Sequence, residues 1–279
     1  MRLATVSYDG ATRAAIINAE GGASLLHYPS ASEAMIAEVK APGTLAAAKP
    51  TARLAASEVT LLAPVPRPGK ILGSGINYTS HKDENPNAVM PVEPGFFSKF
   101  PSSVTGPDAD VVLPAPESEV DYEVELAIVI GKPGKNIGRE NAYEHVFGYT
   151  LVNDISGRDV QFRANQMDLG KGFDTFCPMG PWVVTPDELA NVNNVRVRSW
   201  VNGELRQDSS TAEWLYDVPA LLEHASRHLT LETGDIITTG TPAGCGTFRR
   251  PPLWLRDGDT VVIEATGVGE LSNRVVKGW

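Results

Sequence analysis

The segment 117–130 constrains the fold of this chain more than any other part of the sequence. Acidic side chains occupy its odd positions as far as 125, and apolar side chains occupy its even positions from 120 to 130. The acidic residues are Glu117, Glu119, Asp121, Glu123 and Glu125. Because successive side chains of a β-strand point to opposite faces, this pattern predicts a strand with one acidic and one apolar face. The apolar run 126–130 indicates that the strand continues into a core.

The acidic face predicts a binding site for a divalent cation. Carboxylates two residues apart on one strand face repel each other, and the repulsion grows where water is excluded. A hard cation with oxygen ligands relieves it, whereas a solvated sheet face is the alternative that the pattern leaves open. No Lys or Arg is interleaved with the acids, and a further acid, Asp154, follows another apolar strand pattern, GYTLVN. We therefore predict Glu123, Glu125 and Asp154 as metal ligands.

The rest of the chain reads as β-rich with few helices, which favours an α+β fold built on a mixed β-roll or barrel. One clear helix is expected at 219–228, where apolar residues recur at helical spacing. The pair Asn202-Gly203 predicts a two-residue hairpin turn. Other expected strands have β-branched or alternating patterns and lie at 71–73, 124–130, 148–152, 182–184, 195–201, 235–239 and 260–265.

Two domains are predicted, with a boundary at a proline-rich segment. Residues 63–69, APVPRPG, contain three prolines in seven positions, which excludes a helix or a central strand there. Before this segment, a hairpin is expected within 1–20 and short Ala-rich helices at 31–41 and 44–49. The predicted organisation is therefore a small N-terminal α/β domain, 1–65, followed by a catalytic domain, 66–279.

Composition narrows the partners and the location. The formal net charge is −10 and no Lys/Arg cluster occurs, so nucleic acid is excluded as a partner. No signal-peptide pattern or membrane-length apolar run is present, which predicts a soluble protein without a membrane partner. The two cysteines, Cys177 and Cys245, cannot form a disulfide framework and have no neighbouring histidine, so we expect a cytoplasmic protein without a thiol nucleophile.

Seven ordered motifs resemble the fumarylacetoacetate hydrolase family over residues 66–279. They are GINYTSHKDE (75–84), FFSKFPSS (96–103), DYEVELAIVIGK (121–132), GYTLVNDISGRDVQ (148–161), KGFDTFCPMGPW (171–182), VNGELRQ (201–207) and LETGDIITTGTPAGCG (231–246). Each motif alone is modest, and together in this order they are specific. The resemblance implies a mixed β-roll, a homodimer and a Mg²⁺ or Mn²⁺ ion, with Ca²⁺ as an ion that crystals could hold. Its metal carboxylates match Glu123, Glu125 and Asp154.

The resemblance also implies roles for further residues. Its catalytic His/Glu pair matches His81 and Glu84, whose i,i+3 spacing lets the carboxylate orient the imidazole. Lys171 lies between two glycines, which let backbone approach a ligand closely, and is expected to be catalytic. The expected substrate contacts are Arg158, Gln161, Thr241 and, as a weaker candidate, Lys99. As bare patterns, a lone histidine, a loop lysine and a glycine-rich turn are also compatible with solvated or structural positions.

Together these residues predict a metal-dependent hydrolase. The expected substrate is a 2-oxo or 2,4-dioxo acid of the acylpyruvate, maleylpyruvate, fumarylpyruvate or fumarylacetoacetate type. Water activated by His81 would attack it and break a carbon–carbon bond, releasing pyruvate or a related acid in aromatic-compound catabolism. An oxaloacetate-type decarboxylase and a 2-hydroxymuconate-type isomerase use the same kind of site and remain alternatives. A protein that only binds metal and organic acid is a more remote one.

Overall fold

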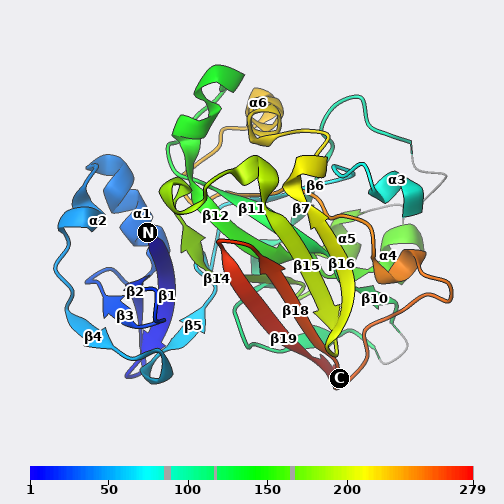
Figure 1. Cartoon of the computed structure of the whole chain (residues 1–279), viewed down its shortest axis with the longest axis horizontal. Coiled ribbons are helices and arrows are strands. Elements are labelled where there is room, and N and C mark those ends of the chain that lie inside the picture. The colour runs from blue at the N-terminus through cyan, green and yellow to red at the C-terminus, as the bar shows by residue number, and fades with distance from the viewer. Residues whose placement is uncertain (85–88, 116–117, 164–166, 279) are drawn as a thin grey trace.

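The computed structural model describes residues 1–84, 89–115, 118–163 and 167–278, and it confirms a β-rich fold with some helices (Figure 1). Glu117 of the acidic segment lies outside the described residues. The helices are α1 (Ala31–Lys40), α2 (Thr44–Ala47), α3 (His81–Glu84), α4 (Arg158–Arg163), α5 (Met167–Lys171) and α6 (Val218–His228). Helix α6 coincides with the helix expected at 219–228, and Asp217 caps its N-terminus by accepting a hydrogen bond from the backbone N–H of Ala220.

The larger sheet runs through the whole molecule. In spatial order its strands are β4 (Ala52–Leu54), β3 (Ala23–Leu25), β2 (Ala11–Ile17), β1 (Arg2–Tyr8), β14 (Cys177–Val184), β12 (Val146–Asn153), β11 (Val124–Ile130), β17 (Ile236–Thr238), β6 (Ile71–Ser74) and β7 (Phe96–Lys99). Two further strands join it at its side, β5 (Thr60–Leu62) on β1 and β8 (Val104–Thr105) on β14. The acidic segment therefore enters a strand at the centre of this sheet.

A second sheet packs against the first. Its strands are, in order, β16 (Glu204–Ser210), β15 (Arg196–Val201), β18 (Thr260–Ala265), β19 (Gly269–Lys277) and β9 (Val111–Leu113). Strands β15 and β16 form the predicted hairpin, and Asn202 and Gly203 both have positive φ angles, of 53° and 79°, as a tight turn of this kind requires. A two-stranded ladder joins β10 (Val120–Asp121) to β13 (Ser156–Gly157).

The N-terminal part shares its sheet and its core with the rest of the chain. Strand β1 pairs antiparallel with β14, with Arg2 opposite Val184 and Leu3 opposite Val183. Leu3 lies in one apolar cluster with Ala127 and Val129 of β11. The predicted segment 63–69 contains no helix or strand, and Figure 1 shows the N-terminal part, in blue, at one side of the molecule. The domain boundary itself stays a prediction.

Strand β11 explains how an acidic face can lead into a core. Its even positions, including Leu126 and Ile128, pack into the cluster between the two sheets. Its odd positions change from acidic to apolar along the strand. Glu125 is followed by Ala127 and Val129, which pack in one apolar cluster with residues of the N-terminal part. The regular strand begins only at Val124, so the acidic segment is not one continuous strand as the pattern predicted. The acids consequently lie where the strand emerges from the core.

No helix among the described residues is both long and apolar enough to cross a membrane.

Candidate active site

The three predicted metal ligands meet at the ends of two central strands. Val124, at the start of β11, lies opposite Asn153, at the end of β12, and the N–H of Asp154 donates to the carbonyl oxygen of Glu123 at 2.9 Å. This register brings carboxylate oxygens of Glu123, Glu125 and Asp154 within 4.8 Å of one another. All three side chains are buried. Glu125 and Asp154 are distant in sequence, and the antiparallel pairing of β11 with β12 brings them together.

Two buried lysines hold these carboxylates together. The Lys171 ammonium donates to Glu123 Oε2 at 2.6 Å and to Asp154 Oδ2 at 2.7 Å. The Lys99 ammonium donates to Asp154 Oδ1 at 2.5 Å, and also to the carbonyl oxygens of Ile155 and Lys171. Lys171 lies on the pocket side of the cluster, whereas Lys99 is fully buried and is not among the side chains that line the pocket. Lys99 is therefore placed to support Asp154 rather than to meet a ligand in the pocket.

Charge crowding gives the carboxylates opposite tendencies. Burial would raise the pKa of Glu123, but Lys171 and Arg158 outweigh it and hold that pKa far below its ordinary range. Glu125 forms no ion pair with a cation among the described residues, so burial, followed by repulsion from Asp154 and Glu123, holds its pKa well above the ordinary value. Burial would lower the pKa of Lys171, yet Asp154 and Glu123 raise it, so this lysine stays protonated.

The residues present fit a hard divalent cation. Within the described part of this buried cluster, carboxylates outnumber cations. The carboxylates are Asp121, Glu123, Glu125 and Asp154, and the cations are Lys99, Arg158 and Lys171. Burial, followed by repulsion from Asp154 and Glu123, raises the pKa of Glu125, so its charged form is costly here, and a cation with oxygen ligands would lower that cost. The Lys171 ammonium, bound to two of the three carboxylates, shows that this position attracts a cation.

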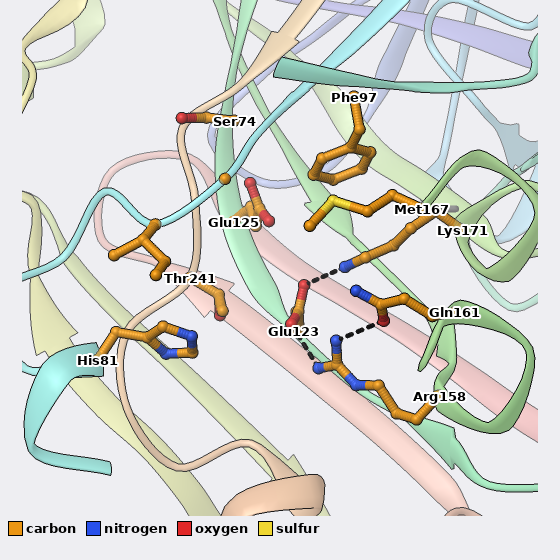
Figure 2. A pocket seen from close by; sticks show the side chains of 12 residues that line it. Ser74, His81, Phe97, Glu123, Glu125, Arg158, Gln161, Met167, Lys171 and Thr241 are labelled. Carbon is orange, nitrogen blue, oxygen red and sulfur yellow. Dashed lines mark hydrogen bonds and ion pairs between the residues drawn. The ribbon is translucent and has the colours of Figure 1, made fainter. Parts of the chain in front are cut away.

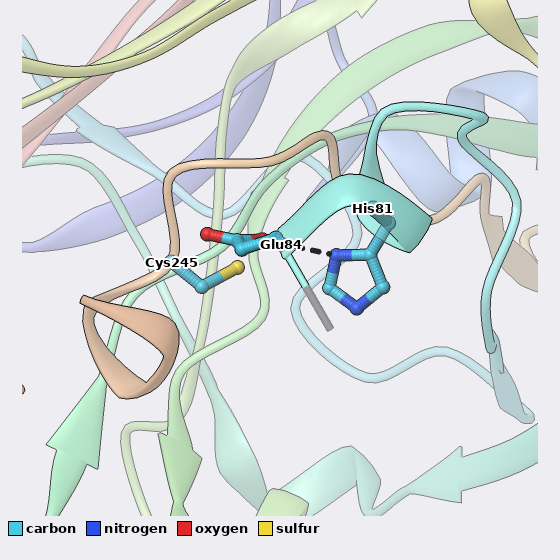
Figure 3. A group of neighbouring side chains, drawn as sticks. All are labelled: His81, Glu84 and Cys245. Atoms are coloured by element: carbon cyan, nitrogen blue, oxygen red, sulfur yellow. Dashed lines mark ion pairs between the residues drawn. The ribbon is translucent and has the colours of Figure 1, made fainter. Parts of the chain in front are cut away.

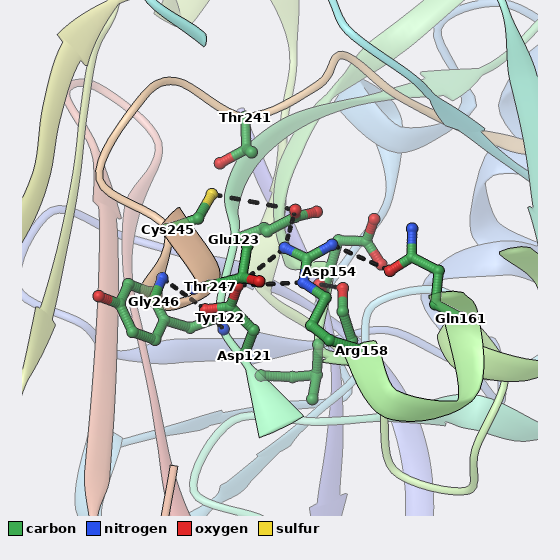
Figure 4. Close-up of polar contacts among 12 residues, drawn as sticks. Asp121, Tyr122, Glu123, Asp154, Arg158, Gln161, Thr241, Cys245, Gly246 and Thr247 are labelled. Carbon is green, nitrogen blue, oxygen red and sulfur yellow. Dashed lines mark hydrogen bonds and ion pairs between the residues drawn. The ribbon is translucent and has the colours of Figure 1, made fainter. Parts of the chain in front are cut away.

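Arg158 is fixed by a carboxylate that the sequence did not single out. Its guanidinium donates to Asp121 Oδ2 at 3.1 and 2.9 Å, to Glu123 Oε1 at 2.5 Å and to Gln161 Oε1 at 3.0 Å (Figure 4). Asp121 also accepts from the backbone N–H groups of Gly246 and Thr247. It therefore joins the acidic segment, α4 and the loop after β17. Its place on the acidic face was visible in the sequence, but its partners were not.

The loop after β17 closes another side of the site. The N–H of Gly240 donates to Glu125 Oε2 at 2.7 Å, and the Thr241 hydroxyl donates to the carbonyl oxygen of Val124 at 3.0 Å. Gln207, from the β15–β16 hairpin, donates to Thr241 Oγ1 at 2.8 Å and to the carbonyl oxygen of Pro242 at 2.9 Å. Gln207 was missed by sequence reasoning, although it ends the motif VNGELRQ. These bonds hold Thr241 at the pocket wall.

A pocket opens directly over the carboxylates, as Figure 2 shows. Its lining residues are Ser74, Gly75, Ile76, His81, Phe97, Glu123, Glu125, Arg158, Gln161, Met167, Lys171 and Thr241. The Lys171 ammonium lies 5.0 Å from the centre of the Phe97 ring, a favourable cation–π distance. The structure thus brings most of the predicted site residues to one cavity, and the three that do not line it, Asp154, Glu84 and Lys99, contact residues that do.

His81 lies across the pocket from Lys171, with Glu123 between them (Figure 2). Helix α3 presents His81 Nδ1 to Glu84 Oε2 at 3.4 Å, the i,i+3 arrangement that the sequence predicted. The other Glu84 oxygen accepts a hydrogen bond of 2.7 Å from the N–H of Gly244. The Phe248 ring meets the imidazole edge-on at 5.3 Å between centroids. The pair can therefore move a proton at one wall of the pocket, while the carboxylates and Lys171 form the other.

Comparison with known proteins places this site in a family. The family model described as fumarylacetoacetate (FAA) hydrolase C-terminal matches residues 70–276. An oxaloacetate tautomerase (fahd2, mitochondrial) of Xenopus laevis is 47% identical over 225 residues, covering 80% of this chain and 70% of that protein. The oxaloacetate tautomerase YisK of Bacillus subtilis is 47% identical over 223 residues, covering 78% of this chain and 74% of that protein.

Solved structures agree over the whole chain. A fumarylacetoacetate hydrolase from Exiguobacterium antarcticum is 38% identical, has a TM-score of 0.89, and covers 100% of both chains. A 5-carboxymethyl-2-hydroxymuconate delta-isomerase from Mycobacterium smegmatis is 34% identical, has a TM-score of 0.83, and also covers 100% of both chains. The motif order, the fold and these matches agree, and the chain belongs to the fumarylacetoacetate hydrolase family.

Proposed function

We propose that this protein is a divalent-metal-dependent enzyme that interconverts the keto and enol forms of a small 2-oxo acid, with oxaloacetate as the main substrate. The observation that carries the proposal is the position of Lys171, whose side-chain nitrogen is held at the pocket between two carboxylates of the candidate metal site, Glu123 and Asp154. The names of the relatives from Xenopus laevis and Bacillus subtilis support the reaction and the substrate.

The proposed reaction uses residues on two opposite walls of the pocket, the metal carboxylates with Lys171 on one and His81 with Glu84 on the other. A Mg²⁺ or Mn²⁺ ion held by Glu123, Glu125 and Asp154 would supply Lewis-acid polarisation of the 2-oxo group. Lys171 is protonated and serves as the acid that delivers a proton to C3 of the enol. His81, oriented by Glu84, serves as the base that takes the proton of the enol hydroxyl. His81 takes one proton from the enol oxygen and Lys171 gives one to C3, so the substrate keeps its composition; His81 then releases its proton to solvent and Lys171 takes one up, which restores both groups.

Hydrolysis of a carbon–carbon bond is the second candidate, and the His81–Glu84 pair favours it. An imidazole backed by a carboxylate at the pocket wall can also act as a base towards water. The 2,4-dioxo acids named above would be cleaved by attack of that water on the C4 carbonyl. The Exiguobacterium antarcticum neighbour is named as a hydrolase of this kind. Decarboxylation of oxaloacetate needs no attacking water and is distinguished by its product.

A substrate panel separates these reactions. The protein would be incubated with Mg²⁺ or Mn²⁺, and then with EDTA, against oxaloacetate, acylpyruvates, maleylpyruvate, fumarylpyruvate and fumarylacetoacetate. We expect metal-dependent loss of enol absorbance from freshly dissolved enol-oxaloacetate without release of pyruvate or CO₂. Metal-dependent pyruvate from a dioxo acid, with no effect on the oxaloacetate enol, would replace tautomerisation by hydrolysis. Pyruvate and CO₂ from oxaloacetate would establish decarboxylation instead.

Replacement of His81 by Ala is expected to lower tautomerisation and abolish any hydrolysis, because both need a base at this wall. A loss of about 10²–10⁴-fold is typical when an acid–base group is removed. Decarboxylation, if present, is expected to survive, because no proton is taken from water. His224→Ala, on α6, is the matched control. Full tautomerase activity in the His81 variant would remove His81 from its assigned role.

We also propose that the protein works as a homodimer in a reducing compartment such as the cytoplasm. Both cysteines are free and buried, which suits such a compartment. Three large apolar side chains of α4 and α5, Phe162, Met167 and Leu169, are exposed by 59%, 45% and 55%, which suits coverage by a second copy. Light scattering is expected to give a mass near twice 29.9 kDa, and a mass near one chain would exclude the dimer.

A further inference from the structure

The loop after β17 brings a thiol to the pair His81 and Glu84, as Figure 3 shows. A ring nitrogen of His81, a carboxylate oxygen of Glu84 and the sulfur of Cys245 all lie within 4.8 Å of one another. His81 and Glu84 belong to helix α3, and Cys245 belongs to the loop after β17. The two segments are far apart in sequence: Glu84 and Gly244, which are hydrogen-bonded to each other, are separated by 160 residues. This cluster shares no residue with the carboxylates Glu123, Glu125 and Asp154, and it borders them, because the sulfur of Cys245 lies 3.9 Å from Glu123 Oε1.

Two of the three donors are buried and have no hydrogen-bond partner among the described residues. These atoms are His81 Nδ1 and Glu84 Oε2, which face each other at 3.4 Å without the geometry of a hydrogen bond. Both side chains are largely buried, with 13% and 11% of their surface exposed. Buried polar atoms without partners are rare in folded proteins and call for an explanation. A cation between these atoms would satisfy both of them at once.

The surroundings hold the donors in position. Gly244 N–H binds Glu84 Oε1, which leaves Oε2 turned towards the imidazole. The Phe248 ring packs edge-on against His81. The sulfur of Cys245 lies 3.9 Å from the carbonyl oxygen of Pro242 and 3.8 Å from Gln207 Nε2, in the hydrogen-bonded loop that also holds Thr241. A preformed arrangement of this kind lowers the ordering cost of binding.

The donor set selects a different cation from the carboxylate triad. Mg²⁺ and Mn²⁺ prefer oxygen ligands, whereas one nitrogen, one oxygen and one sulfur are typical ligands of Zn²⁺. Three protein ligands leave a fourth, open position on Zn²⁺. A carboxylate, a thiolate and a neutral imidazole together neutralise the charge of a divalent ion. The thiol gives up its proton on binding, and that proton leaves to solvent.

We propose that His81, Glu84 and Cys245 form a second cation site, selective for thiophilic divalent ions such as Zn²⁺, whose occupation inhibits the enzyme. Zn²⁺ held there occupies the lone pair of His81 and the free oxygen of Glu84, so neither can move a proton. The inhibition rests on the proposed function of this pair, whereas the binding does not. A role for Cys245 as a nucleophile is disfavoured, because burial, followed by Glu123 and Asp121, holds the thiol pKa well above its ordinary value.

Binding is tested on the full chain without any assay of turnover. With the carboxylate site saturated by Mg²⁺, Co²⁺ is added as a spectroscopic probe, and a thiolate-to-cobalt charge-transfer band is expected. Zn²⁺ affinity is then measured by competition with a chromophoric chelator. Cys245→Val and Cys245→Ser are expected to lack the band and to bind Zn²⁺ about 100-fold more weakly or worse, since even loss of a supporting contact costs about 10–100-fold.

Cys177→Ser is the matched control, because Cys177 is the other buried thiol of this chain. It is expected to keep the band and the Zn²⁺ affinity of the unchanged protein. The site is overturned if Cys245→Val binds Zn²⁺ as tightly as the unchanged protein, or if the band depends on Cys177 instead. His81→Ala, which keeps both thiols, is expected to weaken Zn²⁺ binding to a similar extent, and unchanged affinity there would equally contradict the site.

Inhibition is tested separately, with each variant compared with its own activity in Mg²⁺ alone. Zn²⁺ is expected to inhibit the unchanged protein over the concentration range in which it binds, and Cys245→Val is expected to require about 100-fold more. Equal sensitivity of the two proteins, or full turnover with Zn²⁺ bound, overturns the inhibitory role. If no 2-oxo acid is turned over, the proposed function fails, while the cobalt band still decides whether the cation site exists.

Discussion

Replacement of Glu125 by Gln is expected to lower metal-dependent turnover strongly while making the metal-free protein more stable. Glu125 is one of three clustered carboxylates, and the change removes a charged ligand with almost no change of shape. Lewis-acid polarisation contributes several kcal/mol to such reactions. A loss of about 4 kcal/mol corresponds to a rate decrease of about 1000-fold. Turnover would be measured over a range of Mg²⁺ and Mn²⁺ concentrations, so that weaker binding and slower chemistry are separated.

The gain in stability follows from the electrostatics of the metal-free site. Burial and repulsion from Asp154 and Glu123 hold the pKa of Glu125 well above its ordinary value of 4.5. The folded chain therefore retains a proton that the unfolded chain releases, and the free energy of unfolding falls as pH rises from 4.5 through the folded-state pKa. A glutamine cannot ionise. In EDTA near neutral pH, the variant is expected to have a higher free energy of unfolding than the protein with Glu125.

Glu123→Gln is the variant to compare with Glu125→Gln. It also removes a carboxylate from the metal site, but it is expected to lower the stability of the metal-free protein. The pKa of Glu123 is held far below its ordinary range because it pairs with Lys171 and Arg158, so its removal leaves buried cations less compensated. Both variants should lose turnover, but only Glu123→Gln should lose stability in EDTA. Equal metal-dependent activity in Glu125→Gln and the unchanged protein would remove Glu125 from the metal site.

The metal-site carboxylates were predictable from the sequence. Their prediction needs only the alternation of residues along one strand and an acidic residue at the end of a second apolar strand. Alternation in segment 117–130 indicated that Glu123 and Glu125 share a face, and an acid after a second apolar strand indicated Asp154. Antiparallel pairing of β11 with β12 then confirms the juxtaposition. His81 and Glu84, three residues apart in sequence, are likewise in contact on helix α3.

The remaining features depend on contacts between distant segments, which periodicity does not encode. Asp121 pairs with Arg158, 37 residues away, and Gln207 reaches Thr241 across 34 residues from a hairpin in the other sheet. Lys99 illustrates the difference most clearly. The motif FFSKF suggested a contact with substrate, but β7 carries Lys99 behind Asp154, where its ammonium has three protein acceptors. Whether a polar residue faces a ligand or supports a neighbour depends on which side of the carboxylates its strand lies.

Replacement of Lys171 by Met is expected to lower turnover strongly and, at the same time, to strengthen metal binding. Removal of the acid that delivers the proton costs about 10²–10⁴-fold in rate. The ammonium also competes with a cation for Glu123 and Asp154, to which it is bound at 2.6 and 2.7 Å. Without that competitor, Mg²⁺ should bind more tightly. Isothermal titration would measure the affinity, and enol-oxaloacetate decay would measure the rate.

Lys99→Met is the control that separates these two roles of a buried lysine, because it removes the same charge from the same carboxylate, Asp154. Lys99 does not line the pocket, so its loss should cost stability, typically about 3–5 kcal/mol for a broken buried pair. With the metal site saturated, it should cost much less turnover than the loss of Lys171. An equal loss in the two variants would mean that the substrate contact expected for Lys99 is real. Retained turnover in Lys171→Met would instead require another acid at the pocket, and Lys171 would then serve only to hold the carboxylates until the metal binds.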